Sequence, residues 1–178
     1  MGIVPDTKDW TWVITRPCAD CGYDASLVGR TMVAPLLRDN VRTWLVVLTR
    51  PHIAVRPDEA TWSPLEYGCH VRDVFRVFSS RLDLMRSLDD PLFPNWDQDE
   101  TAISGDYRAQ HPSSVAASLE TSGMALAEEF SGVQPSEWSR TGRRTDGASF
   151  TVETLALYLL HDVSHHVWDV RPATQLDS

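Results

Sequence analysis

Lysine is almost absent from this chain. Lys8 is the only lysine among 16 basic residues, which face 25 acidic residues and give a formal net charge of −9. Nucleic-acid binding depends on clustered positive charge that neutralises phosphates, so this charge balance argues against a nucleic-acid partner. The preference for arginine over lysine also fits a GC-rich coding genome.

Long apolar runs are missing as well. No window approaches the roughly 20 apolar residues that a membrane span needs. The opening MGIVPDTKDW lacks the basic region and apolar run of a signal peptide. We therefore expect a cytoplasmic protein with a small-molecule partner and no membrane contact. The 178 residues, 42% hydrophobic and 23% charged, predict one globular domain over 1–178.

Cysteine is scarce, and its three positions do not form a secreted disulfide framework. Cys18 and Cys21 form a Cys-x-x-Cys unit within an N-terminal extension, residues 1–24, while Cys69 stands alone. One such unit is half of a zinc site and needs two more ligands. Two reduced cysteines that anchor the extension are the favoured interpretation, with a second metal site or a redox pair as alternatives.

No stretch of useful length alternates apolar and polar residues as a half-buried strand would, whereas helical periodicity recurs four times. It predicts helices over about 25–48, 64–88, 113–130 and 151–170. Pro35 is expected to kink or split the first helix, and Pro172 to stop the last. The pattern predicts an all-α four-helix bundle. A crossover connection of roughly 24 residues joins its second and third helices, a length typical of functional or mobile loops.

The second helix has the clearest start. Ser63 is the expected N-cap, Pro64 occupies the first helical position, and Glu66 follows three residues after the cap. This is a capping box with proline where helices prefer it.

Three histidines crowd the segment LLHDVSHHVWDV in the last helix. His161 and His165 are four residues apart and therefore share a helix face, where two imidazoles can reach one divalent metal ion. His70, on the inward face of the second helix, is the expected third ligand. Three protein ligands leave room for water or substrate, as in a catalytic site. The alternative is that these are half-buried polar residues without a metal.

Several neighbours are candidates for supporting roles. His166 is rotated about 100° from His165, so we expect it to support the site or a helix contact rather than bind the same metal. Ligating histidines usually pass their other N–H to a carboxylate. The candidates for that acceptor are Glu66, Asp73, Asp162 and Asp169. Tyr158 and Trp168 share the face of His161 and are expected to line a pocket or the core.

The combination of WSPLEYGCH with HDVSHH some 90 residues later resembles the DinB-like superfamily of metal-binding four-helix bundles. The resemblance implies that His70, His161 and His165 bind a divalent metal, often zinc or nickel in that family. It also implies thiol-dependent chemistry, because well-understood members are S-transferases or isomerases that use a low-molecular-weight thiol. The GC-rich composition tilts that thiol toward mycothiol. The Cys-x-x-Cys unit is outside the family pattern.

Two arginines precede the last helix in TGRRTDG. Arg143 and Arg144 are candidates for binding carboxylates, which thiol cofactors and many of their substrates carry. A solvated basic loop is the alternative.

The sequence thus predicts a metal-dependent, thiol-dependent transferase or isomerase in detoxification, acting as a homodimer. A metal-dependent hydrolase is one alternative. A non-catalytic metal-binding bundle, acting in stress response or dimerisation, is the other.

Overall fold

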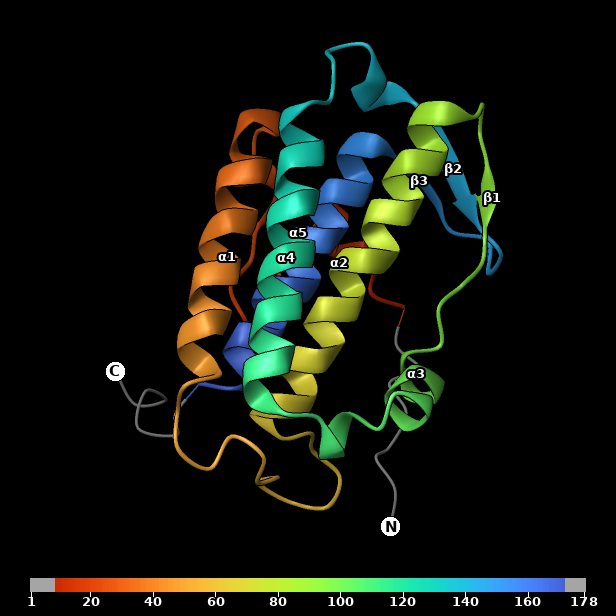
Figure 1. Ribbon diagram of the computed structural model, residues 1–178. Helices are drawn as coiled ribbons and strands as arrows, with labels where there is room; N and C mark the ends of the chain where they lie inside the picture. Colours follow the sequence, from red (N-terminus) through yellow and green to blue (C-terminus); the bar gives the residue numbers. More distant parts are fainter. Residues whose placement is uncertain (1–8, 172–178) are drawn as a thin grey trace.

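A computed structural model describes residues 9–171 of the chain. Four long helices lie side by side as a bundle (Figure 1): α1 (Val33–Val47), α2 (Pro64–Ser87), α4 (Pro112–Ser131) and α5 (Val152–Asp169). Helices α4 and α5 each pack against both α1 and α2. The expected four-helix bundle is confirmed.

The start of α2 follows the sequence pattern. The Ser63 side chain accepts a hydrogen bond from the Glu66 backbone N–H, and the Glu66 carboxylate accepts one from the Ser63 N–H at 2.9 Å. The same carboxylate pairs with the Arg56 guanidinium. At α5, Thr151 and Thr154 exchange equivalent hydrogen bonds, which fix the first turn of the helix that carries the histidines.

The first expected helix is shorter than the sequence suggested. Residues 25–32 form two separate 3-10 turns, Ala25–Leu27 and Arg30–Met32, and α1 begins only at Val33. Pro35 therefore lies in the first turn of α1, where the missing N–H would have no intrahelical partner. The expected kink is replaced by a helix start. Pro172, the expected stop of α5, lies outside the described residues.

A small sheet appears where no strand was expected. Strand β2 (Thr141–Arg144) pairs in parallel with β1 (Leu92–Phe93) and antiparallel with β3 (Ser149–Thr151). These strands are too short to show alternation. They lie at one end of the bundle, whereas α3 (Gln98–Ser104), in the same crossover connection as β1, lies toward the other end (Figure 1).

The N-terminal segment, defined here as residues 9–24, runs against α5. Its 3-10 turn Thr11–Ile14 packs on that helix, and the Tyr23 hydroxyl donates a hydrogen bond to the Leu157 carbonyl at 2.9 Å. Val13 and Cys18 in this segment are buried. The face of α5 that turns away from α1 and α2 is therefore covered by chain that precedes the bundle.

Between α1, α2 and α4 the helices pack closely through apolar side chains. Leu37, Val41 and Trp44 of α1 meet Phe75 of α2 and Leu126 of α4 in one buried cluster. No helix within residues 9–171 has both the length and the apolar character that crossing a bilayer requires.

Gly123 of α4 lies close against α1 and α2 and gives a test of the packing. A Cβ at this position would collide with the Val41 side chain and lie 2.7 Å from Phe75 Cε2. Gly123→Ala should lower the free energy of unfolding by about 1–3 kcal/mol, although alanine is the better helix former. Urea unfolding measures the change.

Gly132→Ala, at the end of the same helix, is the matched control. Its Cβ would meet nothing nearer than 3.5 Å, so its effect should stay within about 0.5 kcal/mol. Equal effects of the two substitutions would contradict close packing at Gly123.

Candidate metal centre

A cavity of about 1090 Å³ opens beside α5. Its wall combines the N-terminal segment, α2, the crossover connection, the β2–β3 turn and α5 itself. Aromatic side chains dominate one part of the lining: Trp10, Trp62, Trp96 and Tyr158. Asp162, His165 and His166 border the same space. Ligand-binding groups therefore face a cavity that is large enough for a small molecule.

Helix α5 carries two i, i+4 pairs of ligand-type side chains. His161 and His165 form one pair, and Asp162 and His166 form the other. Since each residue turns an α-helix by about 100°, the two pairs point in different directions. They belong to two different clusters in the structure.

The first cluster, called here the α2–α5 cluster, consists of His70, Asp162 and His166. Asp162 Oδ1 lies 3.3 Å from His166 Nε2 and 3.6 Å from His70 Nε2. The His70 side chain is 1% exposed and stacks on Trp96 with ring centroids 5.3 Å apart. One carboxylate oxygen and two imidazole nitrogens thus converge at a site where His70 is buried and Asp162 and His166 are about one-fifth exposed.

The donor atoms of this cluster fit a divalent metal ion. Ligand atoms about 2.0–2.2 Å from a tetrahedral metal lie roughly 3.3–3.6 Å from one another, which matches the two separations above. Within residues 9–171, His70 Nδ1, His70 Nε2 and Asp162 Oδ1 are buried without a hydrogen-bond partner. Buried polar atoms are rarely left this way, and a bound metal would satisfy two of the three.

Charge in the metal-free cluster is concentrated on two residues. Burial lowers the pKa of the His166 imidazole, but the carboxylates of Asp162 and Asp169 outweigh burial and raise it to about 9. Burial raises the pKa of Asp162, yet its interactions with His166 and His70 leave that pKa well below its usual range. Burial lowers the pKa of His70. Without metal, an imidazolium–carboxylate pair therefore lies beside a neutral imidazole.

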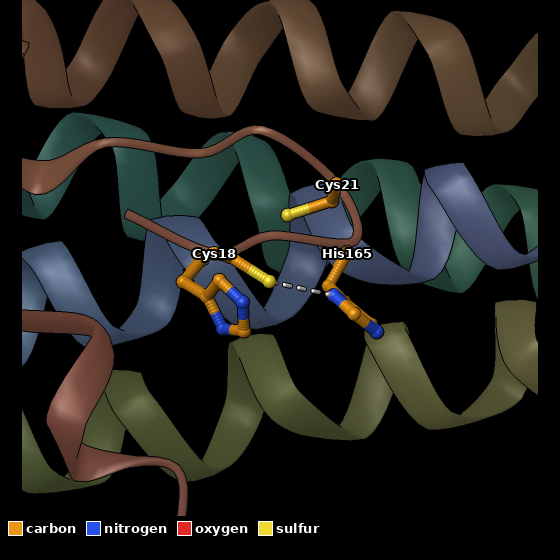
Figure 2. Close-up of side chains that lie close together, drawn as sticks. Cys18, Cys21 and His165 are labelled. Atoms are coloured by element: carbon orange, nitrogen blue, oxygen red, sulfur yellow. Dashed lines mark hydrogen bonds between the residues drawn. The ribbon is translucent and has the colours of Figure 1, made fainter. Parts of the chain in front are cut away.

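The second cluster, called here the Cys–His cluster, consists of Cys18, Cys21, His161 and His165. One ligand atom from each of the four lies within 4.8 Å of the others. Cys18 Sγ is 3.7 Å from His165 Nδ1, and Figure 2 shows the sulfur directed at that ring, with Cys21 on the same turn of chain. Burial and then the adjacent Cys18 thiol raise the pKa of Cys21 to about 11. Cys21 therefore remains a protonated thiol at neutral pH in the metal-free protein.

Asp169 lies beside both clusters. Its Oδ2 is 2.8 Å from His166 Nδ1, and its Oδ1 is 3.7 Å from His165 Nε2. Each of those histidines points its other nitrogen into its own cluster. Asp169 is thus the candidate carboxylate that contacts a histidine of each cluster.

The expected set of His70, His161 and His165 is thus divided by the structure. His70 meets His166 and Asp162, while His161 and His165 meet the two cysteines. The sequence analysis assigned His166 and Asp162 only supporting roles because it chose the pair made of two histidines. The spacing of the apolar residues in α5 was the signal that could have separated the two pairs.

Two other candidate carboxylates are engaged elsewhere. Glu66 caps α2 and pairs with Arg56. Asp73 accepts hydrogen bonds from Arg72 and from the Tyr107 hydroxyl, the latter at 2.7 Å. Both residues therefore stabilise the fold around α2 rather than orient the histidines.

The remaining candidates also separate. Tyr158 and Arg144 line the cavity, whereas Arg143 lies on the exposed side of β2 and pairs with Asp90. Trp168 packs on the His165 ring, with the two ring centroids 5.4 Å apart. The sequence analysis missed Arg81, a buried arginine of α2 that borders the cavity. Its apolar neighbours made this part of α2 read as core.

Fold and site together define a helical-bundle protein with a histidine–carboxylate centre at the edge of a cavity. The sequence profile of the DinB superfamily matches residues 36–170. The chain belongs to the DinB superfamily. Cys18 and Cys21 precede the matched part.

A solved structure shares this fold. YfiT from Bacillus subtilis, described as a probable metal-dependent hydrolase with an unusual four-helix bundle topology, superposes with a TM-score of 0.70 at 17% sequence identity. The match covers 79% of this chain and 82% of YfiT. Among curated protein sequences no match was found.

The ion pairs that His166 makes with Asp162 and Asp169 predict that the stability of the metal-free protein depends on pH. An unfolded histidine has a pKa of about 6.5, whereas folded His166 holds its proton up to about pH 9. In chelator-treated protein this contribution to stability should be complete below about pH 6.5 and lost as the pH rises toward 9. Asp169→Asn removes one of the two carboxylates that raise the pKa of His166. In this variant the loss of stability with rising pH should therefore be complete at a lower pH. Urea unfolding across this range and imidazole NMR titration measure both effects.

His111→Gln is the control, because His111 is exposed at the start of α4. This variant should keep the wild-type dependence of stability on pH. A His166 titration near pH 6.5 in the metal-free protein would contradict the prediction.

Proposed function

We propose that the protein is a metal-dependent enzyme whose divalent metal is held by His70, Asp162 and His166. The observation that carries the proposal is the convergence of two imidazole nitrogens and one carboxylate oxygen at the edge of a 1090 Å³ cavity, with His70 Nε2 and Asp162 Oδ1 buried and without a hydrogen-bond partner among the described residues. Zinc and nickel both accept such donors.

Three ligands on two helices suit catalysis. Zinc sites that only support a fold are closed by four protein ligands, whereas catalytic sites keep a position open. A divalent metal there would lower the pKa of a water molecule or thiol beside it, so that a nucleophile is available at neutral pH. The chain itself orients His166 through Asp169 and holds His70 against Trp96.

Two arginines, Arg81 and Arg144, lie among six aspartates in the cavity wall, and we propose that they receive an anionic group of the substrate. Arg81 is buried, and its guanidinium donates a hydrogen bond to the Pro94 carbonyl at 3.3 Å. Within residues 9–171 no carboxylate makes an ion pair with it. Burial lowers the pKa of Arg81 to about 10, so it stays charged at neutral pH. Arg144, bound to Asp146 at 2.8 Å, lies in the same lining. A carboxylate or phosphate would stabilise this pair of cations.

Hydrolysis is the reaction we favour. Two histidines and one carboxylate form the ligand set of well-known zinc hydrolases, and YfiT is described as a probable metal-dependent hydrolase. Transfer of a mycothiol-type thiol to an electrophile, as in detoxification, is the second candidate. It is supported by a cavity that could hold a thiol cofactor beside a second molecule. The cytoplasmic location and the homodimer stay predictions.

Metal-dependent turnover is the first test. The full chain, loaded in turn with zinc, nickel or iron, is assayed for hydrolysis of carboxylated esters and for thiol transfer to monochlorobimane. His70→Ala and His166→Ala should each reduce turnover by at least roughly 100-fold, because each removes a metal ligand. His111→Ala should leave turnover unchanged. Absence of turnover with every metal and thiol would overturn the proposal and favour a non-catalytic metal-binding bundle.

Recognition of the anionic group is the second test, with two adjacent arginines as a matched pair. Arg144→Met should raise KM for a carboxylated substrate by roughly 10- to 100-fold, since a charge-assisted hydrogen bond is lost. Arg143→Met, outside the cavity, should leave KM unchanged. Neither substitution should change KM for a neutral analogue of the same substrate. Equal responses of charged and neutral substrates would contradict the assignment.

A further inference from the structure

The N-terminal segment brings two thiols onto the far side of α5. Cys18 and Cys21 approach His161 and His165 so that four ligand atoms lie within 4.8 Å of one another. A tetrahedral zinc ion, about 2.3 Å from sulfur and about 2.05 Å from nitrogen, separates these two ligand types by roughly 3.6 Å. The Cys18 Sγ to His165 Nδ1 distance of 3.7 Å is close to this value.

The turn that carries the cysteines is compact and internally bonded. The Cys18 N–H donates to the Tyr23 carbonyl at 2.8 Å, and the Gly22 N–H donates to the Cys18 carbonyl at 2.9 Å. Gly22 has a φ of +75°, with nothing within 4 Å of a Cβ at this position. Glycine is thus needed there for backbone conformation rather than for space. The turn holds both side chains toward α5 without help from a disulfide, as both cysteines are free.

The cluster is partly buried and only partly satisfied. Cys18 is 1% exposed and His161 is 2% exposed, whereas Cys21 and His165 are half-buried. Among the described residues, His161 Nε2 is buried without a hydrogen-bond partner. Two imidazoles and two thiols at this depth have little apolar surface to offer one another. Their burial is explained when a cation joins them.

His165 has the surroundings of a ligand. Its Nδ1 is directed at Cys18, and its Nε2 lies 3.7 Å from Asp169 Oδ1. A carboxylate behind the second ring nitrogen fixes the tautomer of many metal-bound histidines. On the cavity side, the Trp10 ring lies 5.4 Å from His161 and 5.1 Å from His165, which shields the cluster.

We propose that Cys18, Cys21, His161 and His165 form a second metal site that binds zinc with all four protein ligands and fastens the N-terminal segment to α5. Two cysteines and two histidines are a common donor set of structural zinc sites, which are closed to substrate. The zinc displaces the two thiol protons to solvent as it binds. The site lies outside the reaction proposed above, because it uses none of the residues of the α2–α5 cluster.

The proposed zinc site would also affect the wall of the cavity. Trp10 and Thr11, just before Cys18, line the cavity beside Asp162 and His166. Zinc at the Cys–His cluster would hold this wall in place. The N-terminal segment precedes residues 36–170, the part that matches the family, so this fastening is an addition to the shared bundle.

Metal content and cobalt spectroscopy of the full chain, purified under reducing conditions, test the proposal. Wild type should retain zinc after mild chelation, and Cys21→Ser should weaken zinc binding at this site by at least roughly tenfold. Cys69→Ala, a buried cysteine of α2 outside both clusters, is the matched control and should retain zinc. The cobalt form of wild type should show thiolate-to-cobalt charge-transfer bands.

His70→Ala separates this site from the proposed active site. The variant should lose metal-dependent turnover and keep the thiolate-to-cobalt bands, whereas Cys21→Ser should weaken those bands. If the cysteine variant fails to fold, the wild-type cobalt spectrum alone decides. A cobalt-loaded wild type without thiolate bands, or a Cys18–Cys21 disulfide in protein purified with reductant, would overturn the proposal.

Discussion

The rotation of α5 about its own axis decides which metal-ligating groups meet in this protein. His161 and Asp162 are neighbours in sequence but point about 100° apart, and the same holds for His165 and His166. One pair therefore meets α2 and the other meets the N-terminal segment. A rotation of α5 by one residue that turned Asp162 and His166 toward the N-terminal segment would leave the cysteines facing a carboxylate and would present Val163 and Val167 to α2. The apolar contacts of α5 thus determine the chemistry of both clusters.

Asp169 makes the two clusters electrostatically dependent on each other. It is three residues from His166 and four from His165, the two spacings at which helical side chains become neighbours. One carboxylate can therefore orient an imidazole in each cluster. In the metal-free state its charge favours a proton on His166. If a metal took the place of that proton, the same carboxylate would make the imidazole a better ligand.

Much of the fold could be predicted from local sequence, and the division of the site could have been predicted in part. The capping box at Ser63 and Glu66 and the four apolar periodicities are local signals, and the bundle follows from them. The two-residue strand β1 depends on a parallel partner about 50 residues away, for which local sequence holds no signal. The resemblance to a known family grouped His70 with His161 and His165, whereas the structure brings His70 together with the residues that follow them, Asp162 and His166.

The apolar stripe of α5 explains that difference. Leu159 and Val163 face the bundle core. His161 and His165 each follow one of them by two residues, a rotation of about 200°, and so point away from the core. Asp162 and His166 follow by three residues, which returns them to within about 60° of it.

The burial of His161 could not be predicted from the sequence of α5 alone. It depends on the N-terminal segment, which covers the face of α5 that points away from the core. A histidine pair on the outer face of a bundle helix would ordinarily be solvated. Here a Cys-x-x-Cys turn lies over it and supplies the two donors that a closed zinc site requires. The three-residue cluster on the other face has no fourth protein ligand among the groups that the structure brings together. Both clusters contribute histidines to the wall of the cavity, so the difference between them is the number of ligands. That difference is the basis on which we propose fastening for the four-ligand cluster and chemistry for the three-ligand cluster.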